Sequence, residues 1–241
     1  MPRPGAVVFL DFDGTITLRD ATDAILDAFA DPAWLQIEEA WLSGRIGSRE
    51  CLAAQMALVR ASRNEVDCLL DEIGVDPGLR LLLDACAAVA APVHIISDGF
   101  DYCIERILGR PDLNLLPRLN GARIVSSGLR AEGGRWRATF GHPPKPCAHG
   151  CATCKPTAIA DLNAAGAVSV FVGDGMSDRY AAMCADVVFA KGALAAFCET
   201  AAIPYTPYDT LAAVAEGVER LLGAGTPRAP RSLSGKVFPA V

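Results

Sequence analysis

The sequence predicts an α/β fold in which helices cover both faces of a doubly wound, mostly parallel sheet. Four short apolar runs are rich in β-branched residues, as strands buried on both faces are. They cover residues 6–11, 92–97, 168–173 and 186–190. Segments with helical spacing of apolar residues flank these runs, over residues 78–90, 156–165 and 177–185. Strands that alternate with helices are typical of a parallel sheet.

A helical insertion separates the first two predicted strands. Residues 19–77 hold no strand pattern, and four segments within them have helical spacing, over residues 22–29, 34–42, 48–60 and 64–73. Ser62 followed by Glu65 fits a capping box at the start of the fourth helix. Trp34 and Trp41, seven residues apart, share one helical face, which predicts that both pack inside the insertion.

These patterns divide the chain into a core, a cap and a tail. We predict a core from residues 1–18 and 78–225, with a helical cap over residues 19–77. Residues 122–127 and 135–140, joined through Glu-Gly-Gly, predict a small β-hairpin insertion in the core. Residues 226–241 are rich in Gly, Pro, Ser and basic residues, which predicts a mobile tail.

The composition excludes several classes of protein. Hydrophobic residues make up 51% of the 241 residues and charged residues 21%, an ordinary globular balance. A net charge of −6 provides no basic field for a nucleic acid. We see no secretion signal and no apolar run near the roughly 18 residues of a membrane span, so we expect a cytoplasmic protein without a membrane partner. The oligomeric state stays open.

The nine cysteines do not predict a disulfide scaffold, because their number is odd and no secretion signal accompanies them. Six stand singly among apolar residues and are expected to act as small, reduced hydrophobic side chains. They are Cys51, Cys68, Cys86, Cys103, Cys184 and Cys198. His94, inside an apolar run, is expected to be a hydrogen-bonded core residue rather than a metal ligand.

The remaining three cysteines, Cys147, Cys151 and Cys154, lie in one short segment. They would provide three thiolates to a structural Zn²⁺, with His149 or His142 as the fourth ligand. The alternative is a loop ordered by packing, with three reduced thiols. Both interpretations remain open.

Polar residues collect where the predicted strands end, and the carboxyl ends of parallel strands meet at one edge of a sheet. They are Asp11, Asp13 and Thr15 after the first run, Ser97, Asp98 and Gly99 after the second, Asp174 and Asp178 after the third, and Lys155 before the helix that leads into the third. Carboxylates gathered in this way repel one another unless a cation lies between them, and oxygen ligands suit Mg²⁺. We therefore predict a magnesium site at this edge.

The other groups point to phosphoryl transfer. Lys155 provides a fixed positive charge for an anionic substrate, and Ser97 with the N–H groups near Gly14 and Gly99 provides donors for phosphate oxygens. A carboxylate beside Mg²⁺ can attack phosphorus and form an aspartyl-phosphate. A second carboxyl two residues on can act as general acid and then as general base.

The segments 11–15, 97, 155 and 173–178 resemble, in order, motifs I to IV of the haloacid dehalogenase (HAD) superfamily of phosphatases. The resemblance implies a Rossmann-like core with Asp11 as nucleophile and Mg²⁺ ligand. Asp13 would be the acid/base, binding Mg²⁺ through its carbonyl, and its presence favours a phosphatase over a dehalogenase. Asp174 would be the third ligand. The phosphoryl group would be bound by Ser97 and Lys155, with Thr15, Asp98 and Gly99 beside them, and Asp178 would orient Lys155 or a metal-bound water.

Within the superfamily, the helical insertion resembles the C1 cap of the phosphoserine-phosphatase-like branch. Members of that branch have a Glu at the position of Asp20 in this sequence. They also have an Arg that binds the substrate carboxylate, and this sequence has Gln55 at that position. A neutral amide cannot replace the guanidinium, so phosphoserine is disfavoured. Residues 11–20, residues 32–34 and the Cys-rich stretch ending at Cys154 resemble 2-hydroxy-3-keto-5-methylthiopentenyl-1-phosphate phosphatases. Asp98 instead resembles the Ser-Asp of phosphoethanolamine/phosphocholine phosphatases.

We therefore expect a Mg²⁺-dependent phosphatase that hydrolyses a small phosphomonoester through an aspartyl-phosphate. The two substrate hypotheses are 2-hydroxy-3-keto-5-methylthiopentenyl-1-phosphate and an amine-bearing ester. The expected specificity residues are Asp20 and Gln55. Two other classes use comparable groups. A phospho-Asp signalling protein is disfavoured by the insertion after Asp13, since receivers have no cap. A phosphomutase would convert a sugar phosphate without releasing phosphate.

Overall fold

The structure, a computed structural model, describes residues 5–115, 117–141 and 149–223. Its strands form one sheet in the order β4-β3-β2-β1-β5-β6-β7, in which β3 and β4 are antiparallel and the other neighbours are parallel. The strands are β1 (Ala6–Leu10), β2 (Val93–Phe100), β3 (Ile124–Glu132), β4 (Arg135–Thr139), β5 (Val168–Gly173), β6 (Val187–Ala190) and β7 (Thr206–Pro207). This arrangement confirms the predicted doubly wound α/β fold.

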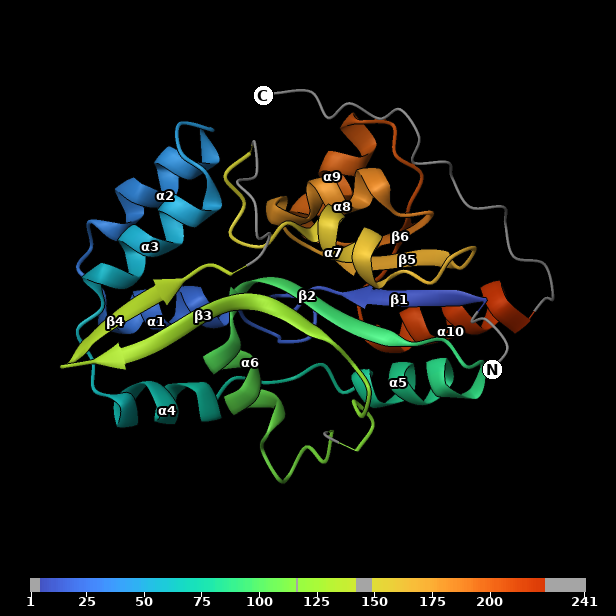
Figure 1. Cartoon of the computed structure of the whole chain (residues 1–241), viewed down its shortest axis with the longest axis horizontal. Coiled ribbons are helices and arrows are strands. Elements are labelled where there is room, and N and C mark those ends of the chain that lie inside the picture. Colours follow the sequence, from blue (N-terminus) through green and yellow to red (C-terminus); the bar gives the residue numbers. More distant parts are fainter. Residues whose placement is uncertain (1–4, 116, 142–148, 224–241) are drawn as a thin grey trace.

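Strand β1 lies between β2 and β5, so its side chains are buried on both faces of the sheet. Val8 and Leu10 belong to one apolar cluster and Val7 and Phe9 to another, as the alternation of a strand requires. Helices α5 (Leu79–Ala88) and α10 (Leu211–Gly223) contribute to the first cluster, and α7 (Lys155–Leu162), α8 (Arg179–Cys184) and α9 (Gly192–Thr200) to the second. Figure 1 shows these two groups of helices on opposite sides of β1.

The predicted helical insertion is present between β1 and β2. It consists of α1 (Ala21–Phe29), α2 (Trp34–Leu42), α3 (Ser48–Leu58) and α4 (Arg63–Asp71), and we call these four helices with their connections the helical insertion. The capping box of Ser62 and Glu65 begins α4, as predicted. The exact division into a core of residues 1–18 and 78–225 and a cap of residues 19–77 stays a prediction.

The β-hairpin is present and forms part of the main sheet, but its first strand, β3, continues to Glu132 instead of ending at residue 127 as predicted. Its two-residue turn, Gly133 and Gly134, has φ of +59° and +76°, which glycine adopts without strain. Strand β3 also pairs in parallel with β2, and the indole N–H of Trp136 in β4 donates to the Ala61 carbonyl at 2.9 Å. The hairpin therefore extends the main sheet as far as the helical insertion. The hairpin and α6 (Asp101–Leu108) together support the helical insertion (Figure 1).

The six single cysteines agree only in part with their expected role as small core side chains. Each of the six single cysteines lies in a helix, and five of them are buried. Cys68 is exposed, because it lies on the outer face of α4, and does not act as a core residue. The tail over residues 226–241 lies outside the described residues. Among those described, no helix combines the length and apolar character that a membrane span requires.

Candidate active site

The carboxylate of Asp11 lies at the carboxyl edge of the sheet because β1 ends just before it. Its backbone N–H donates to the Val172 carbonyl at 2.9 Å, which continues the pairing of β1 with β5. Asp174 follows β5 at the same edge. Gly14 has φ of +71°, and a Cβ there would lie 2.3 Å from an oxygen of Asp174, so the turn after β1 requires glycine.

Three carboxylates meet at this edge, those of Asp11, Asp174 and Asp178, with oxygens within 4.8 Å of one another. Burial, then repulsion by Asp178, raises the pKa of Asp174 to about 6. The same two causes hold the pKa of Asp11 well above its ordinary value, against the attraction of Lys155. A divalent cation would relieve this repulsion, and a set made only of oxygens suits Mg²⁺.

Both carboxylate oxygens of Asp178 already accept hydrogen bonds from protein groups. One oxygen accepts from the ammonium of Lys155, and the other accepts from the N–H groups of Asp174 and Gly175 at 3.0 and 3.1 Å. The carboxylates left for a metal are those of Asp11 and Asp174. This number fits Mg²⁺, which takes one or two carboxylates and completes its shell with water and substrate phosphate.

Lys155 is buried at the start of α7, with its ammonium 2.8 Å from Asp11 Oδ1 and 3.4 Å from the Ser177 hydroxyl. Burial alone would lower the pKa of Lys155, but the attraction of Asp11 and Asp178 outweighs it and holds the pKa above its ordinary value. The ammonium is therefore a permanent charge beside Asp11.

Asp13 lies between the sheet edge and the helical insertion. Its Oδ1 accepts from the N–H of Ala21, the first residue of α1, at 2.8 Å. Burial and then the neighbouring Asp20 hold the pKa of Asp13 well above its ordinary value, which favours a protonated carboxyl. The buried Ser97 hydroxyl accepts from the Gly99 N–H at 3.0 Å. A Cβ on Gly99 would lie 2.2 Å from Asp13 Oδ2, so glycine leaves room for this carboxyl.

Two residues that the sequence placed among the phosphate ligands are bonded to protein groups. The buried hydroxyl of Thr15 donates to Asp174 Oδ1 at 2.7 Å and so orients that carboxylate. Asp98 accepts from the Ser48 hydroxyl at 2.7 Å and from the Thr153 N–H at 3.2 Å. Asp98 thus connects β2 to the helical insertion and to the segment before α7.

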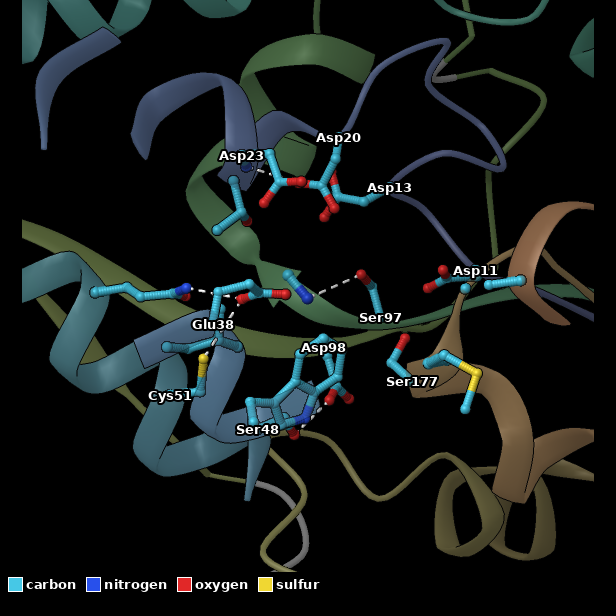
Figure 2. Close-up of a pocket in the computed structure, with 18 of the residues that line it drawn as sticks. Asp11, Asp13, Asp20, Asp23, Glu38, Ser48, Cys51, Ser97, Asp98 and Ser177 are labelled. Atoms are coloured by element: carbon cyan, nitrogen blue, oxygen red, sulfur yellow. Dashed lines mark hydrogen bonds between the residues drawn. The ribbon is translucent and has the colours of Figure 1, made fainter. Parts of the chain in front are cut away.

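A cavity of about 290 Å³ lies between these groups and the helical insertion. The core side is formed by residues that include Asp11, Ser97 and Asp174, and the side of the helical insertion by α1, α2 and α3 (Figure 2). Both expected specificity residues line it. Asp20 is also the N-cap of α1, where it accepts from the Asp23 N–H at 2.9 Å. The buried Gln55 donates to Glu38 Oε2 at 2.8 Å.

The sequence analysis missed several residues of this cavity. Trp41 was expected inside the insertion, but it is half-buried and lines the cavity, because α2 has no fully buried residue and turns this face to the open space. Trp34 is half-buried and packs against the apolar core, as expected. Thr22, Glu38, Ser48 and Cys51 also line the cavity, and no spacing in the sequence distinguished them from ordinary helix residues.

The cysteine-rich segment is described only in part. Cys147 and His142 lie outside the described residues. The His149 ring packs on Tyr180 with centroids 4.4 Å apart, and the Thr157 hydroxyl donates to Cys154 Sγ at 3.1 Å.

His94 is buried, and its Nδ1 accepts a hydrogen bond from the Arg123 N–H at 3.0 Å. This confirms His94 as a hydrogen-bonded core residue.

Known proteins resemble this chain over most of its length. A 2-hydroxy-3-keto-5-methylthiopentenyl-1-phosphate phosphatase of Brevibacillus brevis is 31% identical over 207 residues, which are 85% of this chain and 90% of that protein. The enzyme of the same name from Geobacillus thermodenitrificans is 29% identical over 218 residues, 89% of this chain and 96% of that protein. A solved substrate complex of a phosphoserine phosphatase has the same fold, with a TM-score of 0.64 at 16% identity, covering 90% of this chain and 99% of that one.

The sequence model of the haloacid dehalogenase-like hydrolases matches residues 8–183. This span includes the three aspartates of the metal-binding cluster, Lys155 and the whole helical insertion. The chain therefore belongs to the haloacid dehalogenase-like hydrolase family.

Proposed function

We propose that this protein is a phosphatase that hydrolyses a small phosphomonoester through an aspartyl-phosphate on Asp11. The observation that carries the proposal is the position of Asp11, which lies beside the ammonium of Lys155 and the carboxylate of Asp174, with Asp13 two residues away. The names of the two similar enzymes support a phosphomonoester as substrate.

The proposed reaction has two steps at phosphorus. An oxygen of Asp11 attacks the phosphorus while the bond to the leaving alcohol breaks, and the protonated Asp13 gives its proton to that alcohol. Asp13 then removes a proton from water, which attacks the phosphorus and frees Asp11. Lys155 and Ser97 bind the phosphoryl oxygens. Mg²⁺, held by the carboxylates of Asp11 and Asp174 and the carbonyl of Asp13, would neutralise phosphate charge.

Several finer predictions belong to the proposal. The compound in the names of the similar enzymes is the first substrate hypothesis, and an amine-bearing ester is the second. For the loop before Lys155, Zn²⁺ bound by Cys147, Cys151, Cys154 and His149 stays one of two open hypotheses, beside a packed loop with three reduced thiols. A cytoplasmic location without a nucleic-acid partner also stays a prediction.

The test is phosphate release from p-nitrophenyl phosphate with Mg²⁺. We expect multiple turnovers, and a loss of more than about a hundredfold in Asp11→Asn, because the attacking oxygen is replaced by an amide. Asp13→Asn should accumulate phosphoenzyme, since no group remains to activate water. Asp27→Asn, an exposed carboxylate in α1, is the matched control. Phosphorylation without turnover would indicate a signalling protein instead, and sugar phosphate conversion without phosphate release would indicate a mutase.

A further inference from the structure

We propose that the cavity binds a positively charged ammonium group on the leaving alcohol of the ester. The proposal rests on the proposed function, and of the two substrate hypotheses it favours the amine-bearing ester over the compound in the names of the similar enzymes. Four carboxylates that the reaction does not use line the cavity, and one of them, Asp98, is bonded to Ser48 and Thr153. The other three are Asp20 and Asp23 at the start of α1 and Glu38 in α2. Figure 2 shows all three on the side of the cavity away from Asp11.

No positive protein charge balances these carboxylates inside the cavity. Among the described residues that line it there is no lysine or arginine, and none of the three carboxylates forms an ion pair with a described residue. A leaving group with its own carboxylate would be repelled from this space, whereas an ammonium would be attracted.

The spacing of these carboxylates argues against a second metal ion. Asp11, Asp174 and Asp178 place ligand oxygens within 4.8 Å of one another, and no other group of three described residues does so. Asp20, Asp23 and Glu38 are therefore spread around a wider space. An organic cation fits that space, because it is larger than a bare ion and meets carboxylates on several sides.

The hydroxyl of Thr22 is a second, independent sign of a bound ligand. Thr22 is only 6% exposed and lines the cavity, and its Oγ1 has no hydrogen-bond partner in the described part of the chain. Most buried polar groups have a protein or water partner, and a buried hydroxyl without one destabilises a fold unless something else meets it. An ammonium N–H or a hydroxyl on the leaving group would satisfy it.

Glu38 is held in a fixed position for such a contact. Its Oε2 accepts from the Gln55 amide at 2.8 Å and from the Cys51 thiol at 3.7 Å. These bonds leave Oε1 without a described protein partner. Gln55 therefore acts as a positioning residue for Glu38. Trp41, on the same helix as Glu38, also lines the cavity, and aromatic side chains attract cations.

The first experiment compares esters that differ only in charge. Phosphocholine is matched with 3,3-dimethylbutyl phosphate, and phosphoethanolamine with propyl phosphate. We expect kcat/KM to be about tenfold higher for the cationic member of at least one pair. One result would overturn this inference and leave the proposed phosphatase activity supported: p-nitrophenyl phosphate is hydrolysed in a reaction that requires Asp11, but neither cationic ester is preferred to its neutral partner. Absence of turnover on every ester would refute the proposed function, and this inference with it.

The second experiment removes the charge of Glu38. In Glu38→Gln the amide oxygen still accepts from Gln55, and we expect the cationic-to-neutral ratio of kcat/KM to fall about fivefold. Glu39→Gln is the matched control, because Glu39 is exposed in the same helix and does not line the cavity. An unchanged ratio in a Glu38→Gln protein with native thermal stability would contradict the inference.

Thr22→Val separates ligand binding from a structural role. Valine keeps the shape and removes the unpartnered hydroxyl, so the melting temperature should stay the same or rise while the ratio for the cationic ester falls. A lower melting temperature with an unchanged ratio would show that the hydroxyl only supports the fold, and would overturn this part of the proposal.

Discussion

The hydroxyl of Ser48 donates a hydrogen bond to the carboxylate of Asp98 across 2.7 Å, although one residue lies in the helical insertion and the other in β2. The same hydroxyl accepts from the Ala152 N–H at 2.8 Å, and the Arg49 N–H donates to the Gly150 carbonyl at 3.0 Å. The start of α3 is therefore bonded both to the strand that carries Ser97 and to the segment that leads to Lys155. These bonds fix the helical insertion over the active site.

We expect Ser48→Ala and Asp98→Asn each to lower kcat/KM several-fold, because a loosened insertion no longer closes the cavity. If the two residues act through their shared bond, the double variant should lose little more than either single one, with a coupling energy of about 1 kcal/mol. The measurement is kcat/KM for all four proteins on one ester. Ser43→Ala, an exposed serine of the helical insertion, is the control. Fully additive losses would show that the bond has no role in closure.

Gly99→Ala should impair the reaction without unfolding the protein. The added Cβ would lie 2.2 Å from Asp13 Oδ2 and 3.1 Å from the Ser97 hydroxyl, so Asp13 must move. A displacement of about 1 Å at an acid/base typically costs about a hundredfold in rate. The measurement is kcat together with the melting temperature. Gly141→Ala, where a Cβ meets nothing within 4 Å, should leave both unchanged. A Gly99→Ala protein with normal kcat would remove Asp13 from the mechanism.

Much of this site could be predicted because it lies at or near the carboxyl ends of strands. Asp11 and Asp174 directly follow β1 and β5, and the topology of a parallel sheet brings such ends together without any knowledge of side-chain packing. Ser97 ends the apolar run of the sequence, but β2 continues beyond it to Phe100. The same pattern placed Asp178 and Lys155 at this edge, but a direct contact between them was expected only through the family resemblance.

The residues of the helical insertion could not be placed in this way. Whether Glu38, Ser48 or Trp41 faces the cavity depends on how the insertion packs on β4 and α6, and that packing involves contacts far apart in the sequence, such as Trp136 with Ala61. The longer β3 was missed for a similar reason. Its outer half is paired with β4 alone, and only the register with β2 shows where it joins the sheet.

Magnesium should stabilise the protein less at acid pH. The pKa of Asp174 is raised to about 6, so the folded protein binds this proton more tightly than the unfolded chain, whose aspartates titrate near 3.8. Without metal, the free energy of unfolding should therefore fall as pH rises from about 4 to 6. Mg²⁺ requires the ionised carboxylate, so its effect on the melting temperature should be large at about pH 7.5 and small at about pH 5. Thermal unfolding with and without Mg²⁺ measures this, and a pH-independent effect would contradict Asp174 as a ligand.

Asp76 should matter for stability rather than for activity. Its buried carboxylate accepts from the Gly78 N–H at 2.7 Å and from the Leu211 N–H at 3.1 Å, and so joins the starts of α5 and α10. Asp76→Ala would leave two buried N–H groups without an acceptor, at a cost of about 2–4 kcal/mol in the free energy of unfolding. Urea unfolding measures the loss, with Asp84→Ala as the control. The side chain of Asp84 is 56% exposed, and among the described residues its one ion pair is with Arg118, so its removal should cost less than about 1 kcal/mol. If both variants lost a comparable free energy of unfolding, the buried hydrogen bonds of Asp76 would contribute no more to stability than an exposed ion pair.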